Sequence, residues 1–380
     1  MATDFDKKTM LQVKEGRFLI YRLYDVANEI DLAQAETIIA KRYLISRMRL
    51  HRLRPKAVRF ADPPLTLSAD MAAFELPTLP FTPDQLVIRL YDFGVISVRL
   101  EVPLPPNTPM PEVEAAFREV GEIDPDLLCR QIAHQVMQEV APALRKPQWE
   151  WEEWLDEDYL ILYVRYFAQE SQPDASALLE MYDFARLLMG EEFPLSQQVT
   201  QDVLKYAYTY SAEDLVIVSW ETAFVYETEG IMDVPDLLEF ANAQLLELVF
   251  FDEFLDEELD MAYDDIEAVL HGGGLVRYRH LRRILSRLMM TVMEITELSA
   301  RVMNALKLTE DVYYAKVYEG AAEVLGLPTW MDSVQEKVDN LREIYTMLAE
   351  EASNARMMWL EVSIVVLILL EIILWLLGIG

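Results

Sequence analysis

Two kinds of residue are scarce in this 380-residue sequence: cysteine, which occurs once, and basic residues, of which there are 33 against 65 acidic ones. A single thiol, Cys129, excludes an intrachain disulfide and a zinc site built from several thiolates. The formal net charge of −32 disfavours nonspecific binding of the whole protein to nucleic acid or anionic lipid. The four histidines share no spacing typical of metal ligands, so the sequence predicts neither a metal site nor another cofactor.

Motifs of known catalytic chemistry are also missing. The sequence has neither a Walker loop nor a dinucleotide-binding glycine pattern. His271 and the three glycines after it superficially resemble an esterase oxyanion loop, but no Gly-x-Ser-x-Gly accompanies them, and glycines between two helices serve more simply as a hinge. We therefore expect no enzyme and name no catalytic residue, while an enzyme with an unrecognised pocket stays an alternative.

The N-terminal residues also predict no targeting leader. The first residues, MATDFDKKTM, contain neither the apolar core of a secretory signal nor the Arg- and Ser-rich pattern of a transit peptide. We expect the body of the protein to stay in the cytoplasm. With 52% hydrophobic residues, the chain has enough apolar material for two or three domains with sizeable cores.

Runs of β-favouring residues alternate with helical patterns in the first 230 residues. The runs lie at 17–26, 85–104, 158–167 and 214–227. Helical patterns follow Asp31, a candidate N-cap, and occur as a pair broken near Pro125 and as one helix around 175–189. This alternation, without a Rossmann glycine pattern, predicts an α+β domain over 1–230 with a mixed or antiparallel sheet.

A helical bundle is expected over 231–356. A first long helix ends at the glycines after His271, and two later helices carry the heptad spacing of a coiled-coil seam. The predicted seam residues are Leu281, Leu285, Leu288 and Val292 in one helix and Val338, Leu341, Tyr345 and Leu348 in the other. The seam pairs these two helices as an antiparallel hairpin, or it pairs with another subunit.

The most apolar segment, MMWLEVSIVVLILLEIILWLLGIG, occupies residues 357–380. As a helix it would be about 36 Å long, enough to cross a hydrocarbon core of about 30 Å. Trp359 and Trp375 lie near its ends, where indoles favour the headgroup region. The segment predicts a single-pass, C-terminal transmembrane anchor in membrane lipid, with the body on the cytoplasmic side; a buried core helix is the alternative.

Two acids interrupt this segment. Glu361 lies near the entry interface, whereas Glu371 falls close to the bilayer middle. There it is protonated or snorkels, or it bonds to a neighbouring span and favours a homo-oligomer.

Basic residues cluster twice against the acidic background. The stretch 41–60 contains eight lysines and arginines and no acid, and 277–287 contains five arginines. If exposed, the first cluster could bind phosphate or lipid headgroups through Arg47, Arg49, Arg52, Arg54, Lys56 and Arg59. The alternative for both clusters is neutralisation of acidic helices within the chain. Nucleic acid is disfavoured as a partner because of the overall charge.

The C-terminal half resembles the required-for-meiotic-nuclear-division family, the domain of unknown function 155. The resemblance rests on a first long helix at Pro235–Phe254, on the stretch DVYYAKVYEGAAEVLGLPTW and the helix after it, and on Leu360–Glu361 with Glu371. The opening FLIYRLYDVANEIDLAQAETII and the strand Phe93–Val98 resemble the family's beginning. This resemblance implies membrane-anchored oligomers, linked in eukaryotes to mitochondrial translation or sporulation, with no known catalytic residues.

Together these features predict a tail-anchored oligomeric scaffold or adaptor. It would hold an unknown protein partner, or copies of itself, at the cytoplasmic membrane face. The alternatives are a nucleic-acid or ribosome tether acting through residues 41–59, and an enzyme with a pocket in the α+β domain.

Overall fold

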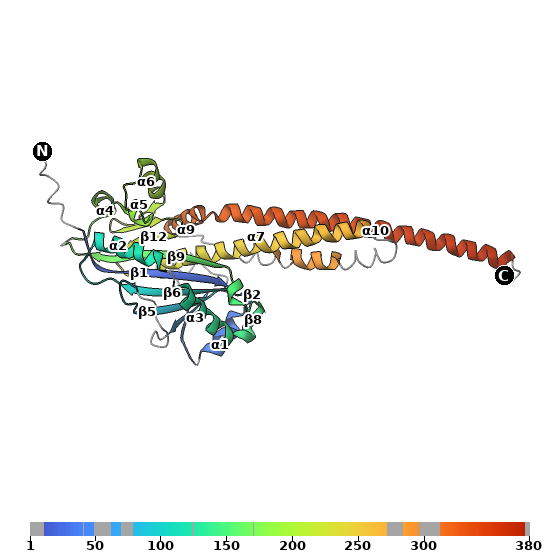
Figure 1. The fold of residues 1–380 in the computed structure, drawn as a ribbon, viewed down its shortest axis with the longest axis horizontal. Coiled ribbons are helices and arrows are strands. Elements are labelled where there is room, and N and C mark those ends of the chain that lie inside the picture. The colour runs from blue at the N-terminus through green and yellow to red at the C-terminus, as the bar shows by residue number, and fades with distance from the viewer. Residues whose placement is uncertain are drawn as a thin grey trace. The chain divides into compact units, whose positions relative to one another are not determined.

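A computed structural model describes residues 11–40, 42–48, 62–69, 79–123, 125–169, 171–271, 284–293, 295–296 and 312–376 (Figure 1). The chain divides into two compact units. Unit 1 comprises residues 1–250 together with 301–328. Unit 2 comprises residues 251–300 together with 329–380.

Unit 1 is built on a large mixed sheet, to which the described residues contribute ten strands. In order across the sheet these are β10 (Ala207–Tyr208), β11 (Asp214–Val218), β12 (Thr222–Glu227), β9 (Asp156–Phe167), β1 (Gln12–Asp25), β6 (Val95–Pro103), β5 (Gln85–Leu90), β4 (Leu65–Ala69) and β3 (Leu44–Arg47), with β7 (Thr108–Pro109) paired to β1. The pair β9–β12 is parallel, and the other pairs are antiparallel. A separate small sheet pairs β2 (Ala27–Ile30) with β8 (Leu144–Pro147). The predicted α+β character and mixed sheet are therefore present.

The central strand β1 is buried on both faces, which explains its nearly continuous run of apolar residues. Phe18 and Ile20 belong to the hydrophobic core on one face of the sheet. Leu19 and Tyr21 alternate with them, point to the opposite face and are fully buried. A strand covered on one face only would instead alternate apolar and polar residues.

Helices cover both faces. On the first face lie α1 (Leu32–Ile39), α2 (Met110–Glu122), α3 (Asp126–Glu139), α4 (Ala175–Met181) and α5 (Phe184–Leu188), while α6 (Gln197–Leu204) follows α5. Among these, α2 and α3 contact β1, and α3 also contacts β6 (Figure 1). Two short 3₁₀ helices, η2 (Ala141–Ala143) and η3 (Trp151–Glu153), follow α3. Asp31 caps α1 as predicted, because its carboxylate accepts a hydrogen bond from the Gln34 N–H at 2.9 Å.

The opposite face of the sheet receives the first part of α7 (Asp233–His271) and α9 (Val312–Val324). The Tyr314 hydroxyl donates to Asp233 at 3.1 Å, which links α9 to the start of α7. Gly320 permits the close approach of α9 to β10, because a Cβ at this position would lie 1.9 Å from the hydroxyl oxygen of Tyr208. Any other residue here would require the Tyr208 side chain to move.

Unit 2 is helical within its described residues. It contains the second part of α7, the helical residues 284–293 and 295–296, and α10 (Leu327–Leu376) from residue 329 onward. Lys337 of α10 forms ion pairs with Asp252 at 2.8 Å and Asp256 at 2.7 Å of α7. Arg342 of α10 donates to Thr296 at 3.0 Å. These contacts join helices of the same chain.

The buried positions of unit 2 follow a spacing close to that of the predicted seam. Leu288, Val338, Leu341 and Leu348 are buried, whereas Leu285, Val292 and Tyr345 are half-buried, and Leu281 lies outside the described residues. The neighbours Ile284, Thr291, Ile295 and Ile344 are buried as well. A helix that contacts two neighbours buries a wider stripe than the narrow seam of a two-stranded coiled coil, which adds these positions.

The structure corrects the expectation of a C-terminal transmembrane helix. Among the described residues, no helix is long and apolar enough to cross a membrane. Near the end of α10 the described side chains are those of residues 360–373. Glu361 and Glu371 are exposed within this stretch, and the side chains of Trp359 and Trp375 lie outside the described ones. The single-pass anchor and the cytoplasmic-face location inferred from it are therefore not supported.

Candidate interaction site

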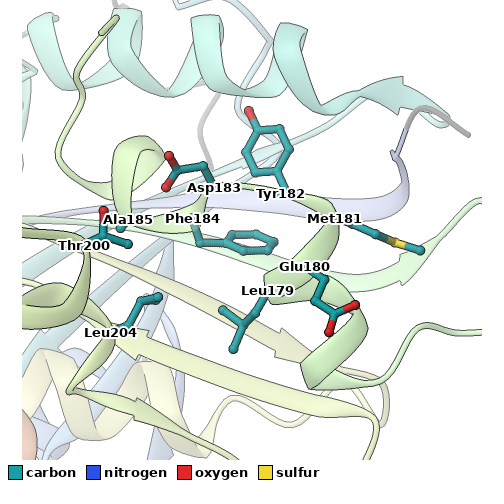
Figure 2. A pocket seen from close by; sticks show the side chains of 9 residues that line it. All are labelled: Leu179, Glu180, Met181, Tyr182, Asp183, Phe184, Ala185, Thr200 and Leu204. Carbon is teal, nitrogen blue, oxygen red and sulfur yellow. The ribbon is translucent and has the colours of Figure 1, made fainter. Parts of the chain in front are cut away.

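A cavity of about 260 Å³ lies among α4, α5 and α6 of unit 1 (Figure 2). Its apolar lining includes Leu179, Met181, Phe184 and Leu204, and its polar lining includes Glu180 and Asp183. Figure 2 shows Leu179 and Leu204 on one side of the Phe184 ring and Tyr182 on the other. We call this cavity with its rim the α4–α6 groove.

The wall of the groove formed by α4 and α5 is firmly attached to the rest of unit 1. Phe184 is buried against Phe224 of β12, with ring centroids 4.3 Å apart. The carboxylate of Glu114 on α2 accepts hydrogen bonds from the Tyr182 hydroxyl and, at 2.8 Å, from the Arg186 guanidinium. Burial, together with the Glu114 carboxylate, raises the pKa of Tyr182, so its hydroxyl stays a donor.

The wall formed by α6 is held less firmly. Ser196 caps this helix by accepting from the Val199 N–H at 3.3 Å, yet α6 buries none of its side chains. Isolated helices of eight residues are marginal in water, and helices in proteins depend mainly on packing for their stability. Large apolar side chains nearby are also exposed, namely Leu179, Met181, Met189, Phe193 and Val199.

A second unpartnered surface lies at the end of α10 in unit 2. Between Leu360 and Ile373, eleven side chains are Leu, Ile or Val, and each is 47–65% exposed. Contiguous apolar patches of this kind are uncommon on proteins that act alone and usually mark interaction sites. We call residues 360–373 the apolar end of α10.

A buried network of charges connects α7 to the opposite face of the sheet. Arg89 on β5 pairs with Asp236 at 2.9 Å and with Glu239, both on α7. Arg99 on β6 pairs with Glu101 at 2.8 Å and with Asp236 at 3.4 Å. These five side chains are only 2–11% exposed. Burial alone would lower the pKa of Arg89, but Asp236 and Glu239 outweigh burial and raise it, so the guanidinium stays charged.

A small cavity of about 90 Å³ lies at the end of β1, lined in part by Asp25, Asn28, Lys146 and Glu153. Burial raises the pKa of Asp25 to about 8. Glu247 of α7 is also buried, and burial together with the charges of Asp25 and Asp92 raises its pKa well above the usual range. The pair therefore retains protons at neutral pH. Among the described residues, no group of three or more His, Cys, Asp or Glu side chains could hold a metal ion.

The predicted phosphate-binding cluster is described only in part. Arg47 is paired with Glu36 at 2.6 Å and also donates to the carbonyl oxygens of Leu32 and Pro63. Arg42 is paired with Glu139. These two arginines neutralise acids of their own chain, in line with the alternative interpretation of the cluster. Arg49, Arg52, Arg54, Lys56 and Arg59 lie outside the described residues, and for them phosphate binding stays a prediction.

Sequence comparison places unit 1 in a family. Residues 15–233, more than half of the chain, match the family described as "Uncharacterized protein MJ0711, N-terminal domain". The chain belongs to this family. The match begins in β1, includes the whole α4–α6 groove and ends at the first residue of α7.

A relative from Methanocaldococcus jannaschii, described as "Uncharacterized protein MJ0711", is similar to this chain in sequence. The two are 27% identical over 218 residues, which cover 57% of this chain and 66% of the relative. The matched region thus spans just under two thirds of that relative. No solved structure matches the chain. Residues 234–380, which carry most of the resemblance to the meiotic-nuclear-division family, lie outside the family match.

Proposed function

We propose that this protein is a self-associating scaffold. The apolar ends of α10 from several copies would pack together, and unit 1 of each copy would bind a partner. The observation that carries the proposal is the exposure of eleven Leu, Ile and Val side chains between Leu360 and Ile373. Such a surface is stable in water only when another molecule covers it.

The free energy available from burying the apolar end is comparable to the cost of association. Fully burying one Leu, Ile or Val side chain is worth about 1.5–3 kcal/mol, so burying the remaining half of eleven is worth about 8–16 kcal/mol. Association of two proteins costs about 4–15 kcal/mol before any contact is counted. The apolar end alone therefore roughly offsets this cost.

The distribution of these residues favours more than two copies. Positions 364–370 are all apolar and exposed, and at 3.6 residues per turn they surround the helix completely. One neighbouring helix covers a single side and leaves the rest in water. A closed ring of three or more copies covers each helix from several sides. Glu371, which lies inside the apolar end, would then bond to a neighbouring copy and fix the register of the helices.

The test is the mass of the full chain in solution, measured by light scattering and sedimentation over a range of concentrations. The chain has a mass of 44.0 kDa, and we expect an assembly of at least three times this value. Ile368→Glu places a charge inside the apolar end and should shift the protein toward the monomer. Ser353→Glu adds the same charge at an exposed polar position of the same helix and should leave the assembly intact. A monomeric wild-type chain at micromolar concentration would refute the proposal.

A further inference from the structure

The α4–α6 groove has the size of a docking site for side chains. Its volume of about 260 Å³ is below the about 300–1,000 Å³ typical of pockets that enclose a whole small molecule. Its apolar lining, with Leu179, Phe184 and Leu204, suits one or two large aliphatic or aromatic side chains. A protruding side chain of a peptide fits such a space better than a free metabolite.

The rim of the groove is strongly acidic. Of the residues that line the cavity, Glu180 and Asp183 are acidic and none is basic, and the segment 174–204 as a whole has six acidic residues against a single arginine, Arg186. That arginine is already paired with Glu114 at 2.8 Å. Among the described residues, neither Glu180 nor Asp183 forms an ion pair, and both are exposed. The rim is therefore complementary to a positively charged partner.

The exposed residues around the groove suit a helical partner. Met181 and Met189 are each almost half exposed, and methionine side chains adapt to apolar surfaces of different shape. The helix α6 has no fully buried side chain, and only its half-buried Val203 and Leu204 pack against the core, so a second helix placed beside it would add packing. Apolar grooves that receive amphipathic helices bind them through residues spaced three and four apart.

From these features we propose that the α4–α6 groove binds a basic amphipathic helix of a partner protein. The apolar face of that helix would enter the groove beside Phe184 and Leu204, and its Lys and Arg residues would face Glu180 and Asp183. The inference rests on the proposed scaffold function for its biological role, since it names the class of partner that the scaffold would hold. Its physical basis is separate, because the groove lies in unit 1 and the apolar end of α10 lies in unit 2.

The test uses the full chain and two labelled synthetic helices of equal length. Both carry leucine at positions i, i+3, i+4 and i+7; one has lysine and the other glutamate at the remaining positions. Fluorescence anisotropy should show saturable binding of the Lys/Leu peptide and none of the Glu/Leu peptide. Glu180→Lys should weaken binding about two- to fivefold, the range for one exposed ion pair. Asp84→Lys makes the same charge change at an exposed residue just before β5, which is four strands away from β12 in the sheet order, and should have no effect.

A second pair of variants separates apolar contact from charge. Leu179→Asp adds a negative charge and would strengthen a purely electrostatic interaction. We nevertheless expect it to weaken binding about tenfold or more, because it removes an apolar side chain that the bound helix would cover. Met181→Ser should weaken binding in the same direction. Both residues are more than a third exposed, so circular dichroism should show an unchanged fold.

Two outcomes would overturn the inference: equal binding of the two peptides, or equal weakening by Glu180→Lys and Asp84→Lys. The titration is repeated with Ile368→Glu, which interrupts the apolar end of α10. Binding that persists in this variant upholds the groove even if the scaffold proposal fails, and assembly without peptide binding upholds the scaffold alone.

Discussion

The buried charge network between the sheet and α7 predicts an unusually large effect for one substitution. Arg89→Met removes the guanidinium that pairs with both Asp236 and Glu239, at positions that are 11% and 2% exposed. Arg99 alone then faces the two carboxylates of α7 while it also pairs with Glu101. Breaking a buried pair by removing one partner costs about 3–5 kcal/mol. Since domains unfold with about 5–15 kcal/mol, this is a large part of the stability of unit 1.

Urea unfolding gives the measurement, followed by tryptophan fluorescence, to which Trp154, buried in unit 1, contributes. Hydrogen exchange of Gln85–Leu90 locates the effect at β5. Arg145→Met is the matched control, because Arg145 is 59% exposed and its pair with Glu29 at 3.2 Å should contribute about 0–1 kcal/mol. The double variant Arg89→Met with Glu239→Leu should regain most of the lost stability, because an apolar pair then replaces the ion pair.

Two results would refute this reasoning. If Arg89→Met destabilises the protein no more than Arg145→Met, the network does not contribute in the way its burial implies. If the double variant is as unstable as the single one, the loss comes from the packing of Arg89 and not from the uncompensated carboxylates.

Three further perturbations address other parts of unit 1. Gly94→Ala should lower the free energy of unfolding by more than about 1 kcal/mol in urea titrations, because φ is +98° and a Cβ would lie 1.5 Å from the Ala27 carbonyl oxygen. The raised pKa values of Asp25 and Glu247 mean that the folded protein holds protons on these groups that the unfolded chain releases. The free energy of unfolding should therefore fall as the pH rises from about 4 to 8, by up to about 1.4 kcal/mol per pH unit for each group. The double variant Asp25→Asn with Glu247→Gln should flatten that slope. Tyr182→Phe removes one hydrogen bond to Glu114 and should lower the free energy of unfolding by about 0.5–3 kcal/mol. Faster hydrogen exchange in α4 and α5 would locate the effect at the groove.

Much of the sheet follows from local patterns in the sequence. The β-favouring runs at 17–26 and 158–167 lie in β1 and β9, and those at 85–104 and 214–227 contain the pairs β5–β6 and β11–β12. The short strands β3, at the edge of the sheet, and β4, beside it, were not predicted. Their pairing depends on β5, and their own sequences are too short to carry a clear pattern.

The buried charges could not be predicted from local sequence. A single arginine in a strand, such as Arg89 or Arg99, usually marks an exposed face. Its burial depends on Asp236 and Glu239, which are 147 and 150 residues away from Arg89 in the chain. Only the three-dimensional fold brings these groups together.

The groove was missed for a different reason. The residues 175–189 were predicted as one helix, whereas the chain leaves the helix at Tyr182 and starts α5 at Phe184. Asp183 causes the new start, because its carboxylate accepts a hydrogen bond from the Arg186 N–H at 3.0 Å. Asp183 is therefore the sequence feature that could have indicated a new helix start. Tyr182 and Asp183, where the chain passes between the two helices, line the cavity.

The parallel pairing of β9 with β12 has a consequence for how this family can diversify. Parallel neighbours require a long crossover connection, and here the connection includes α4, α5 and α6 together with β10 and β11. Both of its ends are fixed by the register of the sheet, and β10 and β11 are strands of that sheet, so only the helical part from α4 to α6 can gain, lose or exchange residues without disturbing strand pairing. Relatives with the same sheet can therefore carry differently shaped grooves, and exchanging residues 174–204 between two of them should transfer the choice of binding partner.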